Sequence, residues 1–160
     1  MDDVLDAEAV CWQALAVPLP PPALPLDLGD FDAVGIIADV IIALRIHAIE
    51  ASVDAAATIS APNGWHRVVI TARSSGHVVL GVRYLELSTS RYNNLAPVIA
   101  ARGWQLDEDE DGATRRYPPG TEASAAAFEV LAVITSSGAP ADVRSVTAVD
   151  GFGVPVVFSD

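Results

Sequence analysis

The 160-residue sequence contains no lysine, a single cysteine and few aromatic residues. All nine of its basic residues are arginines, against 21 acidic residues, so the net charge is −12. A surface this acidic repels the phosphates of nucleic acids and of anionic membranes. We therefore predict that the protein binds neither nucleic acid nor membrane, and that its charge suits either solubility or attraction to a basic partner.

The chain also lacks the features of exported and membrane proteins. Its only cysteine, Cys11, cannot form an internal disulfide, which is typical of a reducing compartment. The first residues, Met1 to Asp6, are acidic and lack the basic region and apolar run of a signal peptide. The most apolar run, Val34 to Ile49, contains Asp39 and Arg45 and is too short for a membrane span. These absences predict a cytoplasmic protein.

Catalytic and cofactor-binding motifs are missing as well. The histidines His47, His66 and His77 lack the spacing of zinc ligands, and no serine lies in a GxSxG elbow. The sequence GFGVPV lacks the third glycine of a dinucleotide-binding loop. Cys11 has no neighbouring base and indicates a packed thiol rather than a nucleophile. We predict a protein that is not an enzyme and that holds no cofactor or metal.

The most charged segment, residues 107–112, begins like a calcium-binding loop, with acids at alternate positions and glycine at position six. Counting Asp107 as position one, position nine is Arg115 and position twelve is Pro118. Proline cannot supply the bidentate carboxylate that closes such a loop. We expect instead the turn of a β-hairpin, in which Arg115 and Arg116 face the acids across the strands.

The N-terminal part of the chain predicts two helices joined by an extended segment. Residues 2–16 are predicted to form a short helix with acids in its first turns. Five prolines follow within residues 17–29, and they favour an extended strap that lies on the fold. A long helix is predicted from Asp30, as N-cap, to about Glu50.

This long helix is apolar over more than half of its circumference. One stripe at helical spacing consists of Val34, Ile37, Ile41, Leu44 and Ala48. A second apolar face carries Ile42, Ile46 and Ile49. Such a helix is either buried on two sides or supplies a surface to another chain.

The middle of the chain predicts antiparallel strands. Runs at residues 54–61, 65–74 and 77–88 are separated by Asn-Gly and Ser-Gly pairs, which favour tight hairpins. They predict a three-stranded meander. A helix should follow, with Pro97 in its first turn and Gly103 in the left-handed position at its end.

The last third of the sequence predicts a hairpin and a third helix. The hairpin strands begin at Trp104 and at Ala113, on either side of the acidic turn. The helix should begin at Thr121, as N-cap, and stop at Gly138. The residues predicted for its inner face are Phe128, Leu131, Ala132 and Thr135.

Together these elements predict an α+β fold in the order α-βββ-α-ββ-α, with a meander and a hairpin packed against about three helices. We expect a single domain over residues 1–160. Its parts are an N-terminal helix (1–16), the proline-rich strap (17–29), the core (30–138) and two short C-terminal strands (139–160).

This order resembles the type III secretion chaperone-like fold, and particularly the YbjN-type and actinobacterial TY-Chap domains. The resemblance covers about two-thirds of the chain. It rests on a strand leading to an Asn-Leu helix, a Gly-Trp pair, a strand pair and an Ala-rich helix. In this sequence the corresponding residues are Asn94-Leu95, Gly103-Trp104, Arg115-Arg116-Tyr117 and Ala123 to Val133.

The resemblance implies a non-enzymatic domain that binds a segment of another protein and forms a homodimer. It places the dimer interface on the middle helix, at Leu95, Val98 and Ile99. It places the partner-binding residues on the first helix of the core, at Val34, Ile37, Ile41 and Leu44, where a segment would lie in a groove or add a strand.

Two other functions fit the residues. One is a small-molecule-binding or enzymatic α+β domain with a pocket between sheet and helices, which His66 or His77 beside an acid would favour. The other is an immunity or antitoxin-like inhibitor, whose acidic face neutralises a basic toxin.

Overall fold

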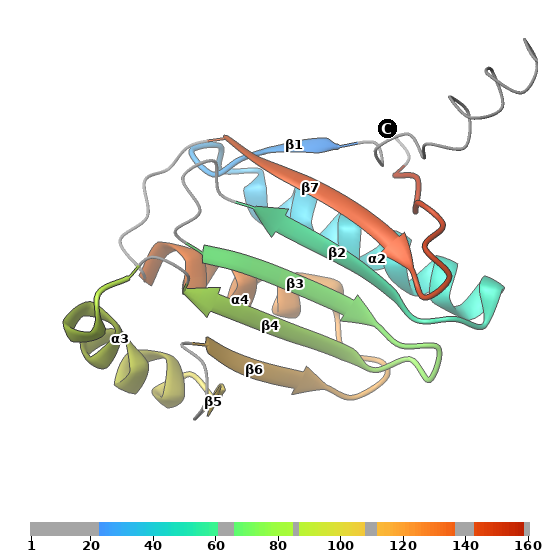
Figure 1. Cartoon of the computed structure of the whole chain (residues 1–160). Coiled ribbons are helices and arrows are strands. Elements are labelled where there is room, and N and C mark those ends of the chain that lie inside the picture. The colour runs from blue at the N-terminus through green and yellow to red at the C-terminus, as the bar shows by residue number, and fades with distance from the viewer. Residues whose placement is uncertain (1–22, 61–65, 85–86, 108–111, 137–142, 159–160) are drawn as a thin grey trace, which may run out of the picture.

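The structure, a computed structural model, describes residues 23–60, 66–84, 87–107, 112–136 and 143–158. These residues form an α+β fold with one antiparallel sheet, and within them lie three helices (Figure 1). The elements, in chain order, are β1 (Leu24–Asp27), α2 (Ala33–Ala51), β2 (Ala55–Ser60), β3 (His66–Ala72), β4 (Val78–Tyr84), α3 (Thr89–Ala101), β5 (Gln105–Asp107), β6 (Gly112–Tyr117), α4 (Ala123–Ser136) and β7 (Val143–Asp150). The predicted fold class is confirmed. The helix predicted for residues 2–16 lies outside the described residues.

The seven strands lie side by side in the order β1-β7-β2-β3-β4-β6-β5. The predicted meander is β2-β3-β4, and the predicted hairpin is β5-β6, which joins the meander through the pairing of β4 with β6. At the turn between β3 and β4, Gly76 has a φ of 97°, which explains the glycine of the Ser-Gly pair.

The sheet is wider than predicted because both ends of the chain add a strand to it. The C-terminal segment was expected to form two short strands outside the core. It forms instead one long strand, β7, whose residues 145–150 pair with the whole of β2, and then a bridge between Val149 and Pro155. The strap residues Leu24–Asp27 form β1 on the outer side of β7.

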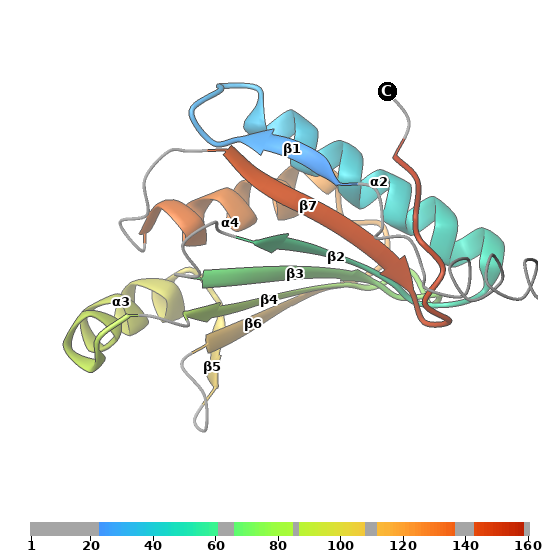
Figure 2. The same ribbon diagram turned by 45° about the horizontal axis from the view of Figure 1, so that its top comes forward.

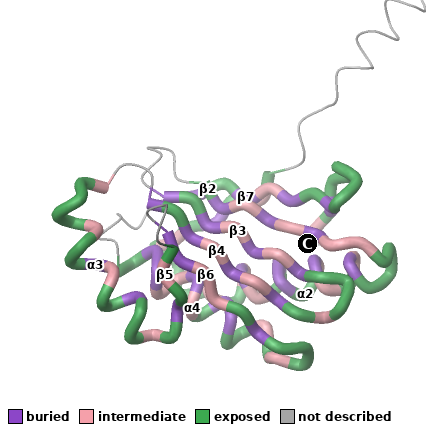
Figure 3. Tube along the Cα trace, turned by 60° about the horizontal axis from the view of Figure 1, so that its bottom comes forward, coloured by how far each residue is buried: buried purple, intermediate pink, exposed green. Residues whose placement is uncertain are grey.

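The helices α2 and α4 cover one face of the sheet and pack against each other, whereas α3 lies at one end (Figures 1 and 2). Burial therefore alternates along the strands (Figure 3). On β3 and β4 the buried residues are His66, Val68, Ile70 and Ala72, and Val78, Leu80, Val82 and Tyr84. This is the face that the alternation predicted, and it forms the core with the helices.

The helix α2 begins two residues later than predicted. Its N-cap is Asp32, and the Asp30 carboxylate accepts a hydrogen bond from the Asp32 amide in the preceding turn. The helix ends at Ser52, which has a φ of 53°. On the side of α4, Arg45 donates a hydrogen bond of 2.6 Å to the Thr121 carbonyl, which links the two helices.

The helix predicted after the meander is present as α3, but it begins at Thr89, so Pro97 does not lie in its first turn. Ser88 caps it by accepting a hydrogen bond from the Arg91 amide, and Pro97 lies inside the helix on an exposed position. Proline is tolerated there because water can reach the carbonyl that its missing N–H would have bonded. The left-handed conformation predicted for Gly103 is confirmed by its φ of 94°.

The inner face of α4 differs from the prediction. Its buried residues are Ala126, Ala127, Val130, Val133 and Ile134. Phe128 is instead 57% exposed, and Thr135 is exposed with its hydroxyl bonded to helix carbonyls. The prediction gave weight to the one aromatic side chain, whereas small alanines face α2 and allow the two helices to approach closely.

Candidate functional site

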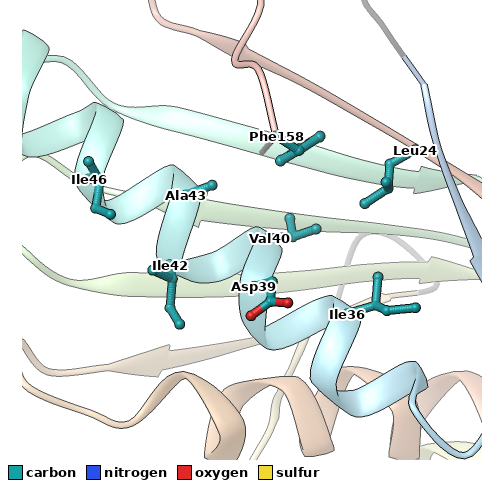
Figure 4. A pocket seen from close by; sticks show the side chains of 8 residues that line it. All are labelled: Leu24, Ile36, Asp39, Val40, Ile42, Ala43, Ile46 and Phe158. Carbon is teal, nitrogen blue, oxygen red and sulfur yellow. The ribbon is translucent and has the colours of Figure 1, made fainter. Parts of the chain in front are cut away.

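An apolar groove runs along the outer side of α2. Its larger part, of about 420 Å³, lies between α2, the β1 residue Leu24 and the C-terminal residue Phe158 (Figure 4). The residues of α2 that line this part are Ile36, Asp39, Val40, Ile42, Ala43 and Ile46. A smaller part of about 230 Å³ shares Ala43 and Ile46 and is completed by His47, Glu50, Val156 and Val157. Because they share lining residues, we treat the two parts as one feature, the α2 groove.

The apolar residues of this side of α2 are open to solvent. Ile42 is 46% exposed, Ile46 52% and Ile49 62%. Figure 4 shows Leu24 and Phe158 on one side of α2, and Val40 and Ala43 on the side of the helix that is turned toward them. Several large apolar side chains exposed along one helix are uncommon on a surface that contacts only water.

A histidine–aspartate pair holds the C-terminal wall of the groove against α2. The Nε2 atom of His47 lies 2.9 Å from Oδ2 of Asp150, whose side chain is 4% exposed. The other oxygen, Oδ1, accepts hydrogen bonds of 2.9 Å from the amides of Phe152 and Val154. The turn after β7 is thus organised around one carboxylate, which sends the chain back along α2.

The surroundings of Asp150 favour its charged form. The hydrogen bond from His47 lowers the pKa of this carboxyl, burial works against the shift, and the amides of Val154 and Phe152 lower it further. The net effect is a pKa below the ordinary value. Sequence reasoning assigned His47 to no site, and no spacing rule connects it with a residue 103 positions away.

The structure separates the predicted partner-binding residues from this groove. Ile37, Ile41 and Leu44 are at most 1% exposed and belong to the core, and Val34 is partly buried against it. A partner cannot reach the three core residues unless the chain opens. The apolar stripe that contains Ile37, Ile41 and Leu44 therefore packs against the sheet and α4. The face of α2 that a partner can reach is the one with Ile42, Ile46 and Ile49.

The three residues predicted for a dimer interface also divide between core and surface. Leu95 and Ile99 are buried on the inner side of α3, and Val98 is 49% exposed. Val98 lies one turn before Arg102, whose guanidinium is 5.9 Å from the ring centre of the exposed Phe128. The outer side of α3 and α4 thus carries a second, smaller apolar surface.

A partly buried carboxylate connects α3, β5 and β6 to α4. Glu129, 12% exposed, accepts two hydrogen bonds from Arg102, at 3.1 and 2.6 Å, and one of 3.2 Å from the Trp104 indole. Nη1 of Arg115 lies 3.2 Å from the same carboxylate and also donates to the Arg102 carbonyl. This paired, bidentate geometry is the strong form of an arginine–carboxylate contact.

The electrostatics of Glu129 follow from these contacts. Burial by itself raises the pKa of this carboxyl, but the hydrogen bonds from Arg102 and Trp104 and the two guanidinium charges outweigh it and lower the pKa. Arg115 was predicted to face the acids of the hairpin. It faces Glu129 because its position on β6 points to the helix-covered side of the sheet, opposite Leu80.

The acidic hairpin is confirmed in its strands, while residues 108–111 lie outside the described residues. Gly112, which sequence reasoning counted as position six of a calcium loop, has a separate explanation. A side chain at Gly112 would place its Cβ 2.5 Å from the carbonyl oxygen of Val82. The glycine thus allows β6 to lie close to β4. Among the described residues, no three His, Cys, Asp or Glu side chains gather to hold a metal ion.

The two histidines that would have favoured a catalytic pocket are elsewhere. His66 is buried, with its Nε2 3.5 Å from a guanidinium nitrogen of the buried Arg144. His77 is exposed beside the turn of the β3-β4 hairpin, and its Nδ1 bonds the Ser75 hydroxyl. Neither lines the α2 groove.

Comparison of the chain with protein-family models, with curated proteins and with solved structures finds no match. The resemblance to the secretion chaperone-like fold therefore stays a prediction. Among the described helices, none has both the length and the apolar character needed to cross a membrane.

Proposed function

We propose that this protein is a chaperone-like domain that binds an apolar segment of another protein in the α2 groove and catalyses no reaction. The observation that supports it most is the row of exposed isoleucines beside a ready-made groove. Grooves of this kind take up the apolar side of a helix or an extended segment. The resemblance of the sequence to the secretion chaperone-like fold supports the same function.

The charges of the groove indicate the chemistry of the partner. Asp39 and Glu50 are the acids that line it, and the whole chain carries a net charge of −12. His47 is the basic residue in the lining, and Asp150 engages it. A segment with apolar residues on one side and arginine or lysine beside them would match both the floor and the rim. The partner we propose is therefore a basic, amphipathic protein segment.

A synthetic probe tests this proposal. We expect a fluorescent 15-residue helix with leucine on one side and arginine on the other to bind the full chain, and more weakly as salt is added. The Ile46→Asp variant should bind it about tenfold or more weakly, because it places a charge in the groove. Thr114→Asp, on the open face of the sheet, is the matched control. Equal binding by wild type and Ile46→Asp would refute the proposal.

We also propose that the domain forms a homodimer in the cytoplasm, through the outer side of α3 and α4. The support is the exposed pair Val98 and Phe128 on either side of Arg102. In this arrangement Leu95 and Ile99 act from within the chain by fixing the position of α3. Light scattering of the wild type should give twice the chain mass, and Val98→Asp should give one chain mass.

The alternative of a small-molecule or enzymatic pocket has less support from the described residues. The hollows lie at the edge of the sheet, between α2, β1 and the C-terminal segment, and they contain neither His66 nor His77. The immunity-like alternative differs from the main proposal only in its partner, a basic toxin. If the protein captured from the native host on the wild type, and not on Ile46→Asp, is a toxic enzyme, that alternative holds.

A further inference from the structure

The described chain begins beside the α2 groove. Ala23 is its first residue, and Leu24, the next one, lines the groove. The preceding 22 residues are therefore joined to the described chain beside this groove. A segment that docks in this groove needs apolar side chains along one side.

The sequence of residues 2–16 supplies an apolar side of suitable length. In a helix, the residues at spacings i, i+1, i+7, i+8 and i+11 lie on one side. These positions are held by Val4, Leu5, Cys11, Trp12 and Leu15. Asp2, Asp3 and Asp6 fall on the other side. The segment is thus predicted to be an amphipathic helix.

The tether has the right length to place this helix along α2. Residues 17–22 include four of the prolines of the strap, and an extended proline-rich chain spans about 3.1 Å per residue, or roughly 19 Å in all. The groove follows α2 from Ile36 to Ile46, about 15 Å, and a 15-residue helix is about 22 Å long. A tether this short keeps the local concentration of the helix on the order of millimolar.

The charges predict that such docking is weak enough to be reversed. The segment carries four acids and no base, and Glu8 lies among its apolar positions. The groove itself is lined by Asp39 and Glu50. Like charges at the rim oppose docking, whereas a basic segment would gain from the same acids.

We propose that residues 2–16 of the same chain dock as a helix in the α2 groove, through Val4, Leu5, Cys11, Trp12 and Leu15. If the groove binds a basic segment as proposed above, this helix is its internal competitor. The partner must displace it, and the acidity of the helix and of the rim makes the displacement favourable. Salt then acts in opposite directions, because it screens the repulsion that opposes the internal helix and weakens the attraction for a basic partner.

The single cysteine of the chain makes a direct test possible. In full-length Ile46→Cys protein, Cys11 and the new thiol should form an intramolecular disulfide when dilute protein is oxidised with diamide. The matched control is Ser145→Cys. Ser145 pairs with Pro25 of β1, the strand to which the tether is joined, but lies on the opposite face of the sheet. We expect the Ile46→Cys disulfide to form at least about tenfold faster than the control disulfide.

The crosslinking products distinguish docking within one chain, docking between two chains and no docking. A disulfide between two chains, with little within one chain, would overturn docking in cis and would assign the groove to a second copy. Equal rates in Ile46→Cys and Ser145→Cys would overturn docking altogether. Binding of the arginine-rich probe tests the proposed function independently. Probe binding without crosslinking refutes this inference alone. Rapid internal crosslinking refutes the proposed function alone if the probe also fails to bind full-length Trp12→Asp protein, in which the internal competitor is weakened.

If both proposals hold, the crosslink should also block the probe. Oxidised Ile46→Cys protein is then expected to bind the arginine-rich helix at least about tenfold more weakly than the same protein after reduction. Oxidised Ser145→Cys should bind it as well as its reduced form. Unchanged probe binding in the crosslinked protein would show that the helix and the partner do not compete.

Discussion

The two faces of α2 carry the same residue type and have opposite environments. Ile37 and Ile41 are closed off between the sheet and α4, whereas Ile42 and Ile46 are about half exposed in a groove. The two sets lie on one continuous helix, so neither helix propensity nor hydrophobicity distinguishes them. What distinguishes them is their neighbours. The side with Ile37 and Ile41 packs against α4 and β3, whereas the side with Ile42 and Ile46 is flanked by β1 and the C-terminal segment.

This contrast shows that an apolar stripe identifies residues that share a face, but does not say what covers that face. The stripe with the strongest periodicity was predicted to bind a partner and is core. On α4 the difference is the reverse: Phe128 was predicted to lie in the core and is exposed. In both helices the inner face is set by the neighbour across the interface, which is a tertiary property.

The largest expected effect comes from the inner face. Ile41→Ala should lower the free energy of unfolding by about 2–5 kcal/mol, because it removes a fully buried side chain and leaves a cavity under the sheet. Urea unfolding followed by circular dichroism measures the change. A loss below about 1 kcal/mol would mean that the two faces of α2 are not as different as their burial indicates.

The next effect concerns the group that fixes the orientation of α4. Glu129→Gln should lower the free energy of unfolding by about 1–3 kcal/mol, because two guanidinium groups lose their charged acceptor. The difference should depend on pH. The pKa of Glu129 is lowered in the folded state, so its contribution is complete above its ordinary value of 4.5 and is lost as pH falls through the lower, folded value.

The control for Glu129 is Glu122, an exposed acid just before the same helix. The urea midpoint of Glu122→Gln should stay close to that of the wild type at every pH between 3 and 7. For Glu129→Gln, the gap from wild type should be widest near neutral pH and should narrow on acidification. A gap that stays constant with pH would assign the loss to packing instead of charge.

Much of the fold could be predicted because it depends on local signals. Alternation placed Val68 and Ile70 on the buried side of the meander, and Gly103 marked the end of α3. These features need only nearest neighbours in sequence. The position of β7 could not be predicted in this way, because its pairing with β2 joins segments about 90 residues apart and depends on which sheet edge is free.

The candidate site was less predictable than the fold for the same reason. Its exposed isoleucines are visible in the sequence, but their exposure depends on the short β1 and on the course of the chain after Asp150. The His47–Asp150 pair and the contacts of Glu129 join residues that no motif connects. For Glu129, the only sequence signal is an acidic residue beside apolar residues in a helix, which does not reveal the arginines that surround it.

A smaller and more local effect is expected at the C-terminal wall of the groove. Asp150→Ala removes the acceptor for the amides of Phe152 and Val154 and the partner of His47. Hydrogen exchange of these two amides should become several-fold faster, while the core amides of β3 keep their protection. Asp27→Ala, which removes a carboxylate bonded to the Gly29 amide, is the control and should not affect residues 152–154. Unchanged exchange would show that the bridge between Val149 and Pro155, with the 3.0 Å hydrogen bond from the Val156 amide to the Ala148 carbonyl, holds the segment without Asp150.

The smallest expected effect on stability completes the comparison on α2. Ile46→Ser should change the free energy of unfolding by no more than about 1 kcal/mol, because half of the side chain is already in water. Its effect should appear instead in binding, with weaker uptake of the arginine-rich probe, whereas Ile41→Ala protein that is still folded should bind the probe as wild type does. The two isoleucines would then separate cleanly, one acting on stability and the other on recognition. If Ile46→Ser destabilises the chain as much as Ile41→Ala, then the outer side of α2 is covered in solution, and the N-terminal segment beside Leu24 is the first candidate for that cover. The Ile46→Cys crosslink distinguishes that cover from a second copy of the chain.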